Sequence, residues 1–330
     1  MTRSFTPPAI FRNGHVQTTL TSLRPRKYLA EKRAALLKNS GQDIVLDCGK
    51  GVQLQGTLNT YPGKTKGLVT LIHGWEGSAE SSYILSAATA LFKEGFSVFR
   101  LNLRDHGDSH QLNQEPFNSS RLNEVLRAVT EIHRIGPHQK RFLAGFSLGG
   151  NFAIRIGLKR ANDELKLSKI VAISPLIDPL TTTENMEKNH KIYHHYFMKK
   201  WKKSLHKKMS CFPEMGDKSV LLSLTSLREM HDYFVPRHTK SKTTEDYFDT
   251  YRLTPHLLQS LSVPTHIISS IDDPITRISE LSEIENANIP CLKIHKVPYG
   301  GHCGFIQDFR LNSWIDNQLV TLFSKTEASY

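Results

Sequence analysis

Short hydrophobic runs recur along the chain, and helical patterns separate most of them. The runs cover residues 43–48, 52–58, 67–74, 96–103, 141–147, 169–175, 265–272 and 291–297. From residue 67 onward the runs are almost continuously apolar, which is typical of parallel strands that are covered on both faces. The first two runs have no helix between them and can form an antiparallel edge of the sheet.

Amphipathic segments with a helical period lie between the later runs. They cover residues 80–94, 119–135, 148–161, 276–286 and 306–324. Strands that alternate with helices predict a parallel sheet built from crossover units. The expected fold class is therefore α/β, with a mostly parallel eight-stranded sheet flanked by helices.

One interval breaks this alternation and predicts an inserted unit. After the run at 169–175 the next strand does not begin until about 90 residues later, which is too long for an ordinary connection. Within it, apolar side chains recur every four residues with lysines between them, as in a basic amphipathic helix: Tyr193, Phe197, Trp201 and Leu205. The aromatic face of this helix can pack on the core with its lysines solvated. It can also serve as a mobile lid that touches anionic lipid or an acidic substrate.

The net charge of +12 is concentrated in one segment. Residues 186–208 hold eight lysines and one acidic residue, which is +7 of the total. Basicity this local, without zinc-finger spacing, an aromatic RNA-binding motif or an internal repeat, argues against a nucleic-acid partner. The segment remains a candidate for peripheral contact with an anionic membrane.

Cysteine spacing and hydropathy indicate whether the protein holds disulfides or a metal and whether it spans a membrane. The chain has four cysteines and no CxxC pair, so neither a disulfide framework nor a metal site is expected: Cys48, Cys211, Cys291 and Cys303. The first residues lack the apolar run of a signal peptide, and no later run reaches membrane-spanning length. We therefore expect a soluble, cytoplasmic protein that can associate with a membrane surface.

The segment GFSLG at residues 145–149 fits the pattern G-x-S-x-G of a nucleophile elbow. It lies between a predicted strand and a predicted helix, where a tight turn would aim the hydroxyl of Ser147 outward. The flanking glycines leave room where a side chain would collide with the neighbouring strand or helix. This context favours a nucleophile over a glycine-rich turn without chemistry, and such a serine needs a base.

A base and an acid are expected later in the chain, in the order Ser, Asp, His. His302 lies in PYGGHCGF, directly after the last predicted strand and before the final helix. Asp272 and Asp273 both follow the penultimate strand, and Asp273, with a proline and β-branched residues after it, fits the acid better. The other aspartate would cap a helix that starts near Pro274. Asp273 would hold the imidazole of His302 in the required tautomer.

Two backbone N–H groups are expected to form an oxyanion hole. One belongs to Leu148, directly after the nucleophile, and the other to Trp75 in LIHGWEGS, after an early central strand. His73 in the same segment fits a residue that braces this loop better than a second base. The loop at residues 104–108 is expected to support the site from behind.

Four segments in this order make the chain resemble the α/β-hydrolase superfamily over nearly its whole length: LIHGWEGS, GFSLGG, SIDDPIT and GGHCGF. The segments FTPPAIFRNGHVQTTL and LREMHDYFVPRHTK are similar to those of the YheT-like group of serine hydrolases. The resemblance implies one α/β-hydrolase domain over residues 1–330. It would have an N-terminal extension at 1–40 and a helical cap inserted after the sixth strand at 176–262.

The resemblance also implies hydrolysis of carboxylic esters. The substrate would be a small acyl ester or a lipid-like molecule, cleaved through an acyl-enzyme and without a cofactor. Transfer of the acyl group to an alcohol would use the same triad, so an alcohol O-acyltransferase is an alternative. A more remote hypothesis is a non-catalytic membrane-surface protein of the same fold, which predicts a broken triad.

Overall fold

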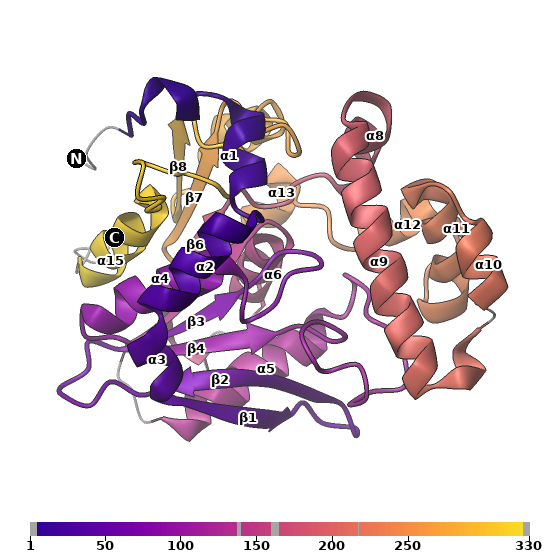
Figure 1. Ribbon diagram of the computed structural model, residues 1–330, viewed down its shortest axis with the longest axis horizontal. Helices are drawn as coiled ribbons and strands as arrows, with labels where there is room; N and C mark the ends of the chain where they lie inside the picture. The colour runs from indigo at the N-terminus through magenta and orange to yellow at the C-terminus, as the bar shows by residue number, and fades with distance from the viewer. Residues whose placement is uncertain (1–4, 137–139, 160–164, 217, 326–330) are drawn as a thin grey trace.

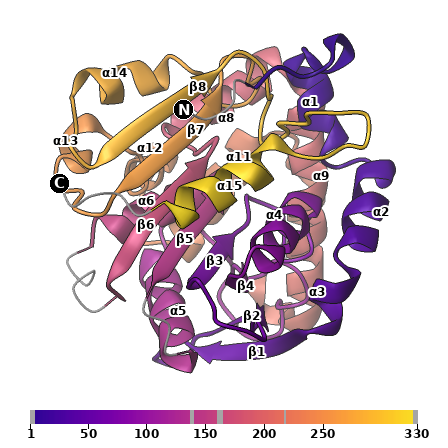
Figure 2. The same ribbon diagram turned by 90° about the vertical axis from the view of Figure 1, so that its left-hand side faces the viewer.

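An eight-stranded sheet forms the centre of the protein in a computed structural model that describes residues 5–136, 140–159, 165–216 and 218–325 (Figure 1). The strand order is β1-β2-β4-β3-β5-β6-β7-β8, which Figure 2 shows from β8 at the top left to β1 at the bottom. The bounds are β1 Gly41–Asp47, β2 Gln53–Asn59, β3 Leu68–Ile72, β4 Ser97–Asn102, β5 Arg141–Phe146, β6 Leu167–Ile173, β7 Thr265–Ser270 and β8 Leu292–Val297. Each predicted hydrophobic run overlaps one strand, so the predicted α/β sheet is confirmed.

Strand directions follow the connections between the strands. β1 pairs antiparallel with β2 and β2 antiparallel with β4, whereas every pair from β4 to β8 is parallel. The antiparallel edge expected for the first two runs is therefore confirmed. Strands β3 and β4 are buried throughout. The expectation of two covered faces is wrong for β8, whose residues are mostly half-buried because it ends the sheet.

Helices cover both faces of the sheet. Helices α4 (Ser82–Lys93) and α15 (Trp314–Ser324) belong to the hydrophobic cluster on one face, and α5 (Leu122–Ile135) and α6 (Leu148–Gly157) to the cluster on the other. A smaller cluster includes α14 (Glu280–Asn286). Two predicted helices begin later than expected. The helix predicted at 306–324 starts only at Trp314, because residues 306–313 form a loop closed by an antiparallel bridge. The helix predicted at 276–286 starts only at Glu280.

Short helices precede the first strand, where the hydrophobic pattern predicted none. They are the 3-10 helix η1 (Ala9–Phe11), α1 (Gly14–Leu20), α2 (Arg24–Arg33) and α3 (Ala35–Asn39). The side chain of Asn13 caps α1 by accepting hydrogen bonds from two backbone N–H groups of its first turn. α2 packs along α4, whereas α1 lies at the upper end of the sheet, close to β7 and β8 (Figure 1).

Further helices lie between β6 and β7 in the chain, and all but the last form a separate layer beside the sheet (Figure 1). They are α8 (Pro179–Asn189), α9 (Lys191–Cys211), η2 (Pro213–Met215), α10 (Lys218–Ser223), α11 (Leu227–His238), α12 (Thr244–Asp249) and α13 (Pro255–Leu258). Leu258 of that last helix belongs instead to the cluster that includes α14. The cap boundaries at 176–262 and the extension at 1–40 stay predictions.

The basic amphipathic helix expected in this interval is α9. Its aromatic face packs on α11: Tyr193 and Leu205 are buried, and Phe197 and Trp201 contact the same hydrophobic cluster. Residues 186–208 are nevertheless not one helix. The chain leaves the helical conformation at His190, which separates α8 from α9.

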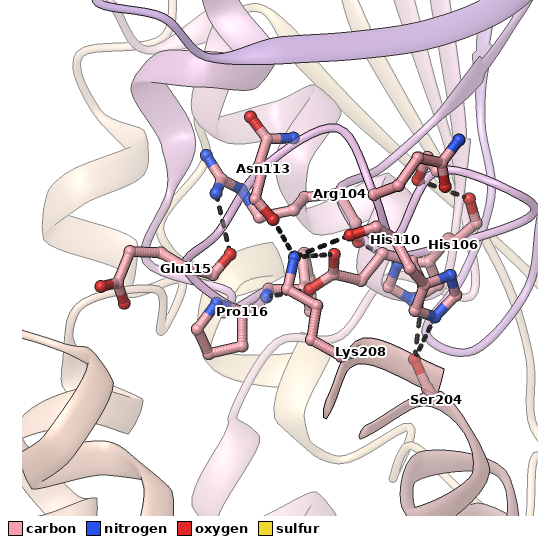
Figure 3. A network of polar contacts seen from close by, with 12 residues as sticks. Arg104, His106, His110, Asn113, Glu115, Pro116, Ser204 and Lys208 are labelled. Atoms are coloured by element: carbon pink, nitrogen blue, oxygen red, sulfur yellow. Dashed lines mark hydrogen bonds and ion pairs between the residues drawn. The ribbon is translucent and has the colours of Figure 1, made fainter. Parts of the chain in front are cut away.

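The expectation that the lysines of α9 are solvated is wrong for Lys208. Its side chain is 1% exposed, and its Nζ donates to Asp105 Oδ1 at 2.8 Å, to the carbonyl of His110 at 3.0 Å and to the carbonyl of Asn113 (Figure 3). One turn earlier, Ser204 Oγ lies 3.0 Å from His110 Nε2. A buried ion pair whose hydrogen bonds are satisfied therefore ties α9 to the loop after β4.

Candidate active site

Ser147 occupies a strained turn between β5 and α6. Its backbone has φ 53° and ψ −118°, a region that residues with side chains rarely adopt. A Cβ added to Gly145 would lie 2.1 Å from the carbonyl oxygen of Gly149, and one added to Gly149 would lie 2.3 Å from that of Ile72. The two glycines therefore let β5, α6 and β3 approach closely enough to form the elbow.

The structure brings His302 and Asp273 to this serine. His302 Nε2 lies 2.8 Å from Ser147 Oγ, and His302 Nδ1 lies 2.9 Å from Asp273 Oδ2. The carboxylate is held in turn: Oδ1 accepts from the backbone N–H groups of Ile275 and Thr276, and Oδ2 from Thr276 Oγ1 at 2.8 Å. An ionised carboxylate only accepts, so Nδ1 carries the hydrogen and Nε2 is free to accept the serine proton.

Asp272, the competing acid, faces another partner. Its Oδ1 accepts from the backbone N–H of Gly301 at 2.8 Å, and its Oδ2 is buried without a hydrogen-bond partner among the described residues. The capping role expected for the second aspartate is wrong. Asp273 accepts the hydrogen bonds of the following turn itself, and the next helix starts only at Glu280.

The pKa values of the two buried histidines at the site, His302 and His73, are shifted in opposite directions. Burial lowers the pKa of His302, but the carboxylate of Asp273 and the thiol of Cys303 together outweigh burial and raise this pKa well above its ordinary value. Burial lowers the pKa of His73 well below its ordinary value, so that imidazole is neutral. Its Nε2 accepts from the backbone N–H of Leu103 at 3.1 Å, and its Nδ1 lies 2.7 Å from the carbonyl oxygen of Gly74. His73 therefore braces the loop.

The loop after β3 brings Trp75 beside the nucleophile. A Cβ added to Gly74 would lie 3.2 Å from Ser147 Cβ, so the two segments are in contact. The next residue, Glu76, donates its backbone N–H to His106 Nε2 at 3.0 Å, and its carbonyl accepts from Lys200 Nζ at 2.9 Å. The loop at residues 104–108 thus supports this segment from behind.

A cavity of about 700 Å³, partly open to solvent, lies above the nucleophile and is lined by Ser147 and His302. Apolar and aromatic side chains supply most of its wall: Trp75, Leu148, Leu176, Met186, Phe197, Trp201, Tyr247 and Ile275. The rings of Trp75 and Phe197 stack at 5.1 Å, with an angle of 9° between their planes. In the described parts of the chain, no group of three His, Cys, Asp or Glu side chains could hold a metal ion.

A second cavity of about 340 Å³ adjoins the first. Both are lined by Phe117, Asn118, Trp201, His231 and Tyr247. Burial lowers the pKa of His231 to about 4, and its Nδ1 lies 2.8 Å from the carbonyl oxygen of Leu227 within α11. Sequence reasoning did not single out Phe117, Asn118 and Tyr247, because a loop before α5 and the distant helix α12 supply them and no local motif marks them.

The N-terminal segment also reaches the site. Thr18 Oγ1 of α1 accepts a hydrogen bond from the backbone N–H of His302 at 2.8 Å. The only sequence signal for this contact was the similarity of FTPPAIFRNGHVQTTL to the YheT-like group.

Comparisons with known proteins identify a family and several similar proteins. A family model described as "Serine aminopeptidase, S33" matches residues 63–302. The esterase candidate YheT of Escherichia coli strain K12 is 25% identical over 96% of this chain and 91% of its own. The monoacylglycerol lipase ABHD2 of Danio rerio is 25% identical over 97% of this chain and 79% of its own. The solved structure of the Pyrococcus furiosus esterase Pf2001 has a TM-score of 0.57 at 18% identity, over 85% of this chain and 90% of its own, and shows the same fold.

Proposed function

The chain belongs to the family described as Serine aminopeptidase, S33, and on this premise we propose that Ser147, His302 and Asp273 form the triad of a carboxylic ester hydrolase. The ester-hydrolase class is supported by the names of the two relatives, an esterase candidate and a monoacylglycerol lipase. The observation that carries the triad is the continuous hydrogen-bonded chain from Ser147 Oγ through His302 to Asp273, at the floor of an apolar cavity.

Acylation would begin with attack of Ser147 Oγ on the acyl carbonyl carbon. His302 Nε2 takes the hydroxyl proton, and Asp273 stabilises the imidazolium without taking the proton itself. The N–H groups of Trp75 and Leu148 stabilise the oxyanion of the tetrahedral intermediate. When the intermediate collapses, the bond to the leaving alkoxy oxygen breaks, and His302 protonates that oxygen to release the alcohol.

Deacylation would repeat these steps with water. His302 Nε2 takes a proton from water while the water oxygen attacks the acyl carbon of the acyl-enzyme. The second tetrahedral intermediate expels Ser147 Oγ, which recovers its proton from His302. The net reaction converts an ester and water into a carboxylic acid and an alcohol.

The cavity favours an uncharged acyl group over the peptide substrate suggested by the family description. An aminopeptidase binds a positively charged α-amino group, and burying that charge requires an opposite charge. The described residues that line the cavity include no aspartate and no glutamate. Their aromatic and aliphatic side chains instead match an acyl chain.

Trp201 is expected to limit the length of the acyl chain. Its ring lies 5.3 Å from that of Trp75 in the first cavity and 6.1 Å from that of Phe234 in the second. Trp201→Ala should join the two cavities and raise kcat/KM for long-chain over short-chain p-nitrophenyl esters on the order of 10-fold, because each newly buried methylene contributes about 0.8 kcal/mol. The measurement is a chain-length series for the wild type and the variant.

Trp201→Phe is the matched control for this prediction. It keeps an aromatic ring between the cavities, so its chain-length preference should stay close to that of the wild type. An unchanged preference in Trp201→Ala would contradict the placement of the acyl chain between these cavities.

Acyl transfer to an alcohol would use the same residues. Water and an alcohol differ only in which of them attacks the acyl-enzyme. Product analysis with added ethanol separates the two activities, since only transfer yields an ethyl ester.

Peripheral contact with an anionic membrane is part of the proposal. Within the described residues, no helix has the length and hydropathy needed to cross a bilayer. The exposed face of α9 carries Ile192, Tyr196, Lys199 and Lys203, so apolar and basic groups share one stripe. Reversing Lys199 and Lys203 to glutamate should weaken binding to phosphatidylserine vesicles by at least about 30-fold, because each lysine near such a surface contributes about 1 kcal/mol.

Vesicle cosedimentation measures this effect. The double variant Lys50→Glu/Lys64→Glu carries the same change of charge at exposed positions outside α9 and should bind nearly as the wild type does. Equal loss in both double variants would assign the binding to net charge and remove α9 as the contact.

A further inference from the structure

The loop that carries His302 has an unusual backbone. Gly301, Cys303 and Phe305 have φ values of 53°, 63° and 47°, and two of the three carry side chains that disfavour this region. A strained backbone of this kind persists only where its surroundings hold it in place. The contacts that hold the loop therefore determine where the imidazole lies.

Residues at the carboxyl ends of β6 and β7 hold the loop on both sides of His302. Gly301 donates its backbone N–H to Asp272 Oδ1 at 2.8 Å, and its carbonyl accepts from Ser270 Oγ at 2.9 Å. Cys303 donates its backbone N–H to Ser174 Oγ at 3.4 Å.

The N–H of His302 itself is held by α1. It donates to Thr18 Oγ1 at 2.8 Å, and the same hydroxyl donates to the carbonyl of Gly14 at 2.6 Å. Thr18 therefore uses its hydroxyl as donor and acceptor at once. The hydrogen bond joins residues 284 positions apart in the chain.

Gln17, next to Thr18, holds the far end of the loop. Its side chain is fully buried, and its Oε1 accepts from the backbone N–H of Ile306 at 2.7 Å. Its Nε2 donates to the carbonyl of Ile306 at 3.1 Å and to that of Phe11 at 2.8 Å. One amide thus pairs with both backbone groups of Ile306, as a neighbouring strand would.

The backbones of α1 and the loop are in direct contact. A Cβ added to Gly301 would lie 2.4 Å from the carbonyl oxygen of Gly14, and one added to Gly304 would lie 2.6 Å from that of Gln17. A Cβ added to Gly14 would lie 1.8 Å from the carbonyl oxygen of Asp272. Glycines on both sides make this approach possible, which sets the distance between Thr18 and His302.

We propose that Thr18 is a positioning residue for the proposed triad, holding His302 in reach of Ser147 through its main chain, with Gln17 fixing the end of the same loop. The inference rests on the proposed role of His302. It assigns a function to an N-terminal segment that lies outside the matched residues 63–302. In this proposal α1, which precedes the first strand of the sheet in the chain, supplies a contact that the active site needs.

The expected effect follows from the chemistry of a buried N–H. Without its acceptor, the N–H of His302 loses a hydrogen bond in a water-poor site, and the strained loop can relax. Misplacing a reacting group by about 1 Å can reduce the rate about 100-fold. Thr18 lies outside the described cavity lining, so substrate binding should change little.

Thr18→Val tests the proposal because valine keeps the shape of threonine and removes the hydroxyl. We expect kcat for a p-nitrophenyl ester, and the rate of fluorophosphonate labelling at Ser147, to fall about 10- to 100-fold. KM should stay within about twofold. Thr18→Ser restores the hydroxyl and should recover most of both rates, and Thr18→Ala should behave as Thr18→Val does.

Thr19→Val is the matched control. Thr19 lies next in α1, and its Oγ1 donates to the carbonyl of His15 without touching the loop. Its rates should equal those of the wild type. Thermal unfolding, followed by circular dichroism, sets an assay temperature at which each variant is folded.

The outcomes separate the two proposals. If the wild type is not labelled at Ser147, the proposed triad is contradicted. If the wild type is labelled and folded Thr18→Val or Thr18→Ala matches its rates, the positioning role is overturned. Equal losses in Thr18→Val and Thr19→Val, or no recovery in Thr18→Ser, would also overturn it, because the effect would then belong to the helix and not to the hydroxyl.

Discussion

Replacement of Ser147 by alanine should lower kcat for ester hydrolysis on the order of 10⁶-fold, to the level supplied by binding and the oxyanion hole alone. The hydroxyl is the proposed nucleophile, and its oxygen lies 2.8 Å from Nε2 of His302, the proposed base. Alanine keeps the Cβ that already fits the turn at φ 53°, so the fold should be retained. Steady-state kinetics with a p-nitrophenyl ester measure the loss, and circular dichroism measures the fold.

Ser223→Ala is the control for this variant. Ser223 lies on the surface of α10, and its loss should leave kcat unchanged. A fluorophosphonate probe should label the wild type and Ser223→Ala but not Ser147→Ala. Retention of more than a few per cent of the activity in Ser147→Ala would contradict the assignment. An unlabelled wild type would favour the non-catalytic membrane-surface protein.

Replacement of Asp273 by asparagine should lower kcat about 10⁴-fold, because the amide would hold the imidazole in the wrong tautomer and would not stabilise the imidazolium. Asp272→Asn provides a matched control at the adjacent position. Asp272 binds the backbone N–H of Gly301, and an amide oxygen can still accept that hydrogen bond. The control should therefore lose far less activity.

The pH profile gives a second measure of the same substitution. Turnover requires neutral His302, so kcat/KM falls as the pH drops through the pKa of this imidazole. In the wild type Asp273 contributes most, with Cys303 beside it, to raising that pKa well above 6.5 against the effect of burial. In Asp273→Asn the raising charge is lost while burial, which lowers the pKa, remains. The acid limb of kcat/KM should therefore move to lower pH. Equal losses in the two asparagine variants, or an unmoved acid limb, would contradict the role of Asp273.

Local patterns in the sequence were sufficient to predict much of the fold. Each described strand overlaps a predicted hydrophobic run. For the central strands β3 and β4 the reason is that a strand buried on both faces must be apolar along its length. The strand-turn-helix context of GFSLG predicted the elbow, whose glycines meet α6 and β3 as expected. The step of four residues predicted α9, because one face of a helix repeats at that interval.

Local patterns in the sequence did not predict contacts between segments that are distant in the chain. Asp272 and Asp273 are neighbours with the same chemistry, and only the turn around them decides which carboxylate meets His302. Lys208 is one lysine among eight in its segment, and only the loop after β4 makes it a buried anchor. The shared wall of the two cavities likewise depends on how α9 and α11 pack together.

The sequence by itself therefore determined the α/β class, the strands and the candidate nucleophile and base, because each depends on residues close together in the chain. Only the tertiary structure decided which aspartate faces the imidazole, which residues line the cavity and which element supports the histidine loop. The hydrogen bond from His302 to Thr18 joins the two ends of the chain. Its partners are set by packing, since a hydroxyl and a backbone N–H carry no sequence pattern that would pair them.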